Sequence, residues 1–112
     1  MLDKYLATRK VLHTEIEDGL EIIQILQCVP KDGLKAFGLL KVAKHHKEVV
    51  LFLLEDFKLK AEACKKYLMN IDSEYAKNQI KSIDEDLRKY NITSEKLLGL
   101  IDIELEKTAY NL

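Results

Sequence analysis

The chain contains very few residues that end helices. It has one proline, Pro30, and four glycines among its 112 residues. Proline cannot continue a helix because it lacks the N–H donor, and glycine in a helix costs conformational entropy. The remaining composition is rich in Leu, Ile, Lys, Glu and Ala, which lose little side-chain freedom in a helix. The sequence therefore predicts an all-α fold, and 47% hydrophobic residues suffice for a packed core.

Three polar segments divide the chain into expected helices. Pro30–Gly33 is a turn signal, while Asn70–Ser73 and Asn91–Ser94 combine an asparagine that can close one helix with a residue that can cap the next. These breaks predict helices over residues 3–28, 32–69, 73–90 and 94–110. We expect a small antiparallel bundle of about four helices that forms a single helical domain over residues 1–112.

Gly19 lies inside the first expected helix. A glycine there costs about 1 kcal/mol relative to alanine. Two interpretations remain open, a close crossing or kink of the helix and a glycine that is simply tolerated.

The second expected helix is unusually long and carries an apolar run from Val49 to Leu54. A short strand is the competing interpretation, but no partner strand can be found. A helical turn that is apolar on every side has to be surrounded, so we expect this helix to be central and to associate with a second copy of the chain. Whether it is continuous or breaks near residues 44–47 stays open. The predicted interface consists of Val49, Val50, Leu53, Leu54 and Phe57.

The cysteines and histidines offer little chemistry. Cys28 and Cys64 are expected to lie too far apart for a disulfide, each as a reduced, small buried side chain. His13, His45 and His46 occur without the ligand spacing of zinc or di-iron sites, so we expect no metal and no cofactor. A histidine phosphocarrier that uses His45 or His46 is the least favoured function.

Charge is distributed unevenly although the net charge is only −1. Residues 31–70 carry a net charge of +4, whereas the segments on either side are acidic. A basic surface is predicted at Lys31, Lys35, Lys41 and His45. It suits a nucleic-acid-associated regulator, an acidic protein partner or a merely solvated face, and the scarcity of arginine counts against base readout.

The longest unbroken apolar run is too short to cross a membrane, and the first ten residues do not resemble a signal peptide. We therefore expect a cytoplasmic protein. No motif for catalysis is found, so the favoured function is a non-enzymatic protein–protein interaction module, such as a small helical adaptor, inhibitor or immunity-type protein. We expect it to form a homodimer, in a coiled-coil-like arrangement. Nucleic-acid binding is the alternative.

Overall fold

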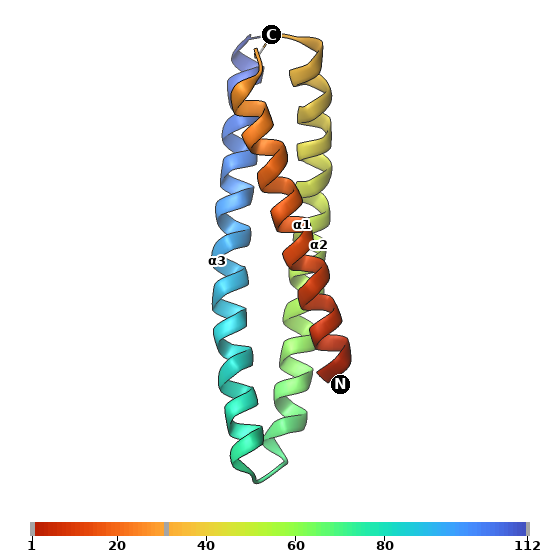
Figure 1. The fold of residues 1–112 in the computed structure, drawn as a ribbon, viewed down its shortest axis with the longest axis vertical. Helices are drawn as coiled ribbons and strands as arrows, with labels where there is room; N and C mark the ends of the chain where they lie inside the picture. Colours follow the sequence, from red (N-terminus) through yellow and green to blue (C-terminus); the bar gives the residue numbers. More distant parts are fainter. Residues whose placement is uncertain (1, 31, 112) are drawn as a thin grey trace.

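Three long helices form an elongated bundle in the computed structural model, which describes residues 2–30 and 32–111. They are α1 (Leu2–Cys28), α2 (Leu34–Met69) and α3 (Glu74–Asn111). Successive helices run in opposite directions, so α1 and α3 point the same way and α2 runs against them (Figure 1). The bundle is 59 Å long and 18 by 17 Å across. The all-α class is confirmed for the described residues, with three helices in place of about four.

A helix break was predicted at Asn91–Ser94, but these four residues are helical in the structure. The apolar stripe of α3 continues in register through it, because Ser94 occupies the inward position between Tyr90 and Leu97. The polar side chains of this segment do not cap a helix end. The Thr93 hydroxyl instead donates to the Lys89 carbonyl, one turn earlier in the same helix, at 3.0 Å. Helices expected over 73–90 and 94–110 are therefore one element of 38 residues.

The turns between α1 and α2 and between α2 and α3 lie at predicted positions, and some of the predicted residues have the expected roles there. The Gly33 N–H donates to the Pro30 carbonyl at 3.3 Å, and α2 begins one residue later. At the other end of the bundle, the Ser73 hydroxyl accepts from the Ala76 N–H at 3.1 Å, as expected of a cap. Asn70 instead keeps right-handed dihedral angles, so it does not close α2 in the left-handed conformation that its residue type allows.

The α2 helix is continuous through residues 44–47, which answers the open question about its length. It contacts both other helices, as expected of a central helix, but it is not surrounded on every side. It packs against α1 and α3 on one side, and large apolar side chains remain exposed on its other side. The three helices instead share an aromatic cluster, in which the Phe57 ring lies 5.6 Å from the rings of both Tyr5 and Tyr90.

Gly19 of α1 packs against the Leu97 side chain of α3. A Cβ atom at this position would lie 2.8 Å from a methyl carbon of Leu97, closer than packed carbon atoms tolerate. This tight contact favours the close-crossing interpretation of the glycine over a merely tolerated one. No helix within residues 2–30 and 32–111 combines the length and the apolar character that crossing a membrane requires.

Candidate functional site

The five residues of the predicted interface divide between the core and its margin. Val50, Leu54 and Phe57 are buried in the core of the monomer, where they contact α1 and α3. Val49 and Leu53 are half-buried at its edge. Three of these side chains are thus unavailable to a partner while the monomer stays folded.

The exposed apolar residues of the same helix lie on the opposite side. Phe52 is 72% exposed and Leu59 is 70% exposed, seven residues further on. Leu34, at the start of the helix, is 93% exposed. Positions that alternate by four and three residues form one stripe, which we call the outer face of α2: Leu34, Gly38, Lys41, His45, Glu48, Phe52, Glu55, Leu59 and Glu62.

Sequence reasoning missed this face because Phe52 lies inside the apolar run of residues 49–54. The run covers a complete turn and a half, so its composition alone does not tell which side faces the solvent. A usable signal was the seven-residue spacing of Phe52 and Leu59, which sets both apart from the buried stripe through Val50, Leu54 and Phe57.

The predicted basic surface lies along the first half of α2. Lys35, Lys41 and His45 are all exposed, while Lys31 lies outside the described residues. Lys44, which the prediction did not include, is exposed beside them. Among residues 2–30 and 32–111, no carboxylate lies within ion-pair distance of Lys35, Lys41 or Lys44.

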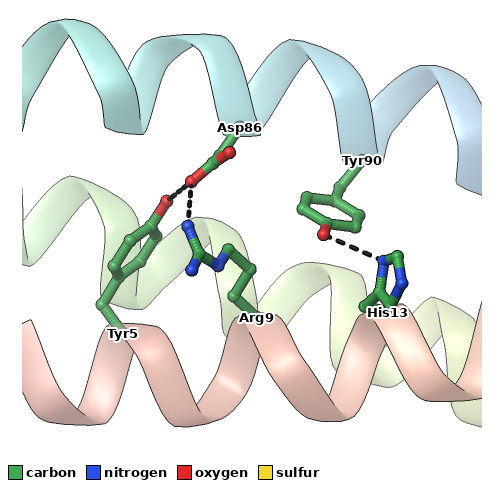
Figure 2. A network of polar contacts seen from close by, with 5 residues as sticks. All are labelled: Tyr5, Arg9, His13, Asp86 and Tyr90. Carbon is green, nitrogen blue, oxygen red and sulfur yellow. Dashed lines mark hydrogen bonds and ion pairs between the residues drawn. The ribbon is translucent and has the colours of Figure 1, made fainter.

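A second polar cluster lies between α1 and α3 and is shown in Figure 2. The Tyr5 hydroxyl donates to Asp86 Oδ2 at 2.6 Å, and Arg9 Nη1 donates to the same oxygen at 2.7 Å. Nearby, the Tyr90 hydroxyl lies 3.0 Å from Nδ1 of His13. A groove of about 570 Å³ opens beside this cluster.

The electrostatics of this cluster stabilise the fold and do not activate a side chain. Burial and the hydrogen bond to Asp86 raise the pKa of Tyr5 above its ordinary value, so the phenol stays protonated. The hydrogen bond to Asp86 also raises the pKa of Arg9. A tyrosine that acts as a base or a nucleophile needs a lowered pKa, which is the opposite of what these contacts produce at Tyr5.

The three histidines have different surroundings. His13 Nε2 lies 2.9 Å from a carboxylate oxygen of Glu17, four residues further along α1. His46 is mostly buried and its Nδ1 atom lies 2.5 Å from Glu15 of α1, whereas His45 is exposed. No group of three or more His, Cys, Asp or Glu side chains within the described ranges is arranged to hold a metal ion.

Both cysteines are free. Cys64 is buried, and this burial raises the pKa of its thiol. Cys28 is exposed at the end of α1, so the expectation that it would be a buried side chain is wrong. Cys28 lies in the same last turn as the fully buried Leu26 but on another side of α1, which the described residues leave exposed.

The end of the bundle formed by the α2–α3 turn carries a second apolar surface. A cavity of about 490 Å³ there is bordered by the start of α1, the end of α2 and the start of α3. Tyr67, Met69 and Tyr75 are exposed around it. This surface has no charge pattern that specifies a partner, in contrast to the outer face of α2.

The fold and these surfaces define the chain as an antiparallel three-helix bundle. Comparison with protein-family models, curated proteins and solved structures found no significant match to it.

Proposed function

We propose that the chain is a non-enzymatic protein-binding module and that it binds through the outer face of α2. The observation that carries this proposal is the exposure of Phe52 and Leu59, two large apolar side chains on one face and seven residues apart. Single exposed apolar residues are common on soluble proteins, but a stripe at helical spacing is typical of a surface that packs against another helix.

The apolar side chains on this face dominate the expected affinity. Full burial of a Phe or Leu side chain contributes about 1.5–3 kcal/mol, whereas an exposed ion pair contributes about 0–1 kcal/mol. Phe52 and Leu59 therefore supply the attraction, while the charges around them select the partner and its direction. The proposal includes a cytoplasmic location, because an exposed free thiol such as that of Cys28 persists best in a reducing compartment.

Photo-crosslinking tests this function directly. A photoreactive amino acid replaces Phe52 in the full chain, which is expressed in its own cells. A matched control carries the same group at Lys81, an exposed position on α3. We expect a covalent adduct with a protein, a second copy included, from position 52 and none from position 81. If position 52 gives no adduct, the proposed function fails.

Nucleic-acid binding is the second candidate. The observation in its favour is that Lys35, Lys41 and Lys44 are exposed without carboxylate partners among the described residues. Glu48 and Glu55 on the same helix would repel phosphate groups, which makes this function the weaker one. It requires binding to DNA or RNA at low salt that weakens as salt rises and that is lost when the three lysines are replaced by alanine. Absence of binding at low salt would remove it.

A further inference from the structure

We propose that the outer face of α2 binds the same face of a second copy of the chain, with the two α2 helices antiparallel. This inference rests on the proposed function and names its partner. It is carried by the distribution of charge along α2 together with the positions of the exposed apolar residues.

Charge changes sign along α2. Residues 34–47 contain four lysines and no carboxylate, whereas residues 48–63 contain four carboxylates and two lysines. A parallel pair of α2 helices would place the basic half of one copy against the basic half of the other. An antiparallel pair places each basic half against an acidic half, so complementary charges favour this direction.

These charges are available to a partner. Lys35, Lys41 and Lys44 make no ion pair with the residues that the structure describes. Glu55 and Glu62 are exposed and have only loose partners within their own helix, at 3.9 Å from Lys58 and 3.6 Å from Lys65. Exposed pairs at such distances contribute little to stability, so exchanging them for contacts with a second copy has a small cost.

The spacing of the outer face also fits an antiparallel pair of helices. Alternation by four and three residues is the pattern of a two-helix seam, in which facing positions form layers. One register places Leu34 of each copy against Leu59 of the other, and its two-fold axis passes between residues 46 and 47. The facing pairs in this register are Leu34 with Leu59, Lys41 with Phe52, His45 with Glu48 and Gly38 with Glu55.

Three of these four layers have a physical rationale. The two leucines bury each other's exposed side chains, and the Lys41 ammonium faces the Phe52 ring in a cation–π contact. The exposed His45 faces a carboxylate. Because the seam contains only one fully apolar layer at each end of the overlap, we expect a weak dimer that dissociates further as salt screens its charges.

Molar mass across a concentration series gives the first test. We expect a reversible dimer that Leu59→Asp weakens by at least about tenfold, because this change places a carboxylate against Leu34 of the second copy. The matched control, Ile103→Asp, changes an exposed apolar residue of α3 and leaves the dimer intact. A wild-type chain that stays monomeric at all concentrations overturns the inference, while an adduct from position 52 with a different protein would still support the proposed function.

Spin labels test the direction of pairing. A label at Lys66→Cys, in a Cys28→Ser chain whose other cysteine is buried, lies outside the predicted overlap. At 1.5 Å per residue the two labels of an antiparallel dimer should be roughly 60 Å apart, whereas those of a parallel dimer should be within roughly 25 Å. The long distance is the expected result, and the short one overturns the inference.

Charge reversal provides an independent check. Replacing Lys35, Lys41 and Lys44 by glutamate should abolish the homodimer, because acidic halves then face each other. Replacing Glu48, Glu55 and Asp56 by lysine should do the same. A mixture of the two variants should form a heterodimer, since both facing pairs of halves are again complementary. Failure of the mixture to associate contradicts the antiparallel arrangement.

Discussion

At the residue scale, Gly19 shows how one missing side chain permits a helix crossing. Leu97 is fully buried, and one of its methyl carbons lies 2.8 Å from the position that a Cβ atom at residue 19 would take. We predict that Gly19→Ala lowers the free energy of unfolding by about 1–2 kcal/mol, because overpacking outweighs the better helix propensity of alanine. Urea denaturation measures this change.

Two other glycines of the chain provide the control. Gly38 and Gly99 have no atom within 4 Å of an added Cβ. Their replacement by alanine should raise stability by about 0.5–1 kcal/mol each, the ordinary helix-propensity gain. In a Leu97→Ala chain, Gly19→Ala should also become neutral or stabilising. If Gly19→Ala behaves like Gly38→Ala in the wild-type chain, the crossing at Gly19 is not tight.

Tyr5 gives stability a dependence on alkaline pH. Burial and the hydrogen bond to Asp86 raise its pKa above the ordinary value of 10.0. Above that pH the unfolded chain releases a proton that the folded chain keeps, so stability that is fully present below about pH 10 falls as pH rises. We predict that Tyr5→Phe loses about 1–2 kcal/mol at neutral pH but shows a shallower decline as pH rises above about 10.

Denaturation curves at each pH measure this effect. Tyr75→Phe, at an exposed position of α3, is the control and should reproduce the wild-type pH dependence. An equally steep alkaline decline in the Tyr5→Phe chain would show that other groups cause it. Lys65 is such a group, because its hydrogen bond to Asp84 raises its pKa and adds to the same alkaline loss.

At the element scale, the continuous α3 helix places one polar side chain in the core. Ser94 is fully buried, and its hydroxyl has no hydrogen-bond partner among residues 2–30 and 32–111. We predict that Ser94→Ala raises stability by about 1 kcal/mol, since it removes an unsatisfied buried hydroxyl and improves helix propensity. Ser82→Ala, at an exposed position of α3, measures the propensity gain alone. Thermal or urea denaturation should show a larger gain at Ser94.

The same segment explains why the sequence predicted one helix too many. Asn91–Ser94 has the residue types of a helix end, as does Asn70–Ser73, which really is a turn. The two segments differ in the pattern around them. The inward positions of α3 keep their spacing of three and four from Ile83 through Tyr90 to Ile101, so packing outweighs local capping preference.

At the scale of the whole molecule, the class of fold was predictable and the exposed surfaces were predictable only in part. Helix content and the turns at Pro30 and Ser73 follow from local residue preferences. The exposed side of Phe52 does not, because it depends on where α1 and α3 lie around α2. Contacts between distant positions, such as Tyr5 with Asp86, depend likewise on how the helices are aligned lengthwise.

Phe52 and Phe57 test this division between core and surface on one helix. Phe57 is fully buried between the rings of Tyr5 and Tyr90, so its removal opens a cavity that all three helices share. We predict that Phe57→Ala lowers the free energy of unfolding by about 3–5 kcal/mol. Phe52→Ala should change it by less than about 0.5 kcal/mol at protein concentrations where the chain is monomeric. Equal losses from the two substitutions, measured by urea denaturation at low concentration, would mean that Phe52 is also covered within the monomer, and the outer face of α2 would then not be a binding surface.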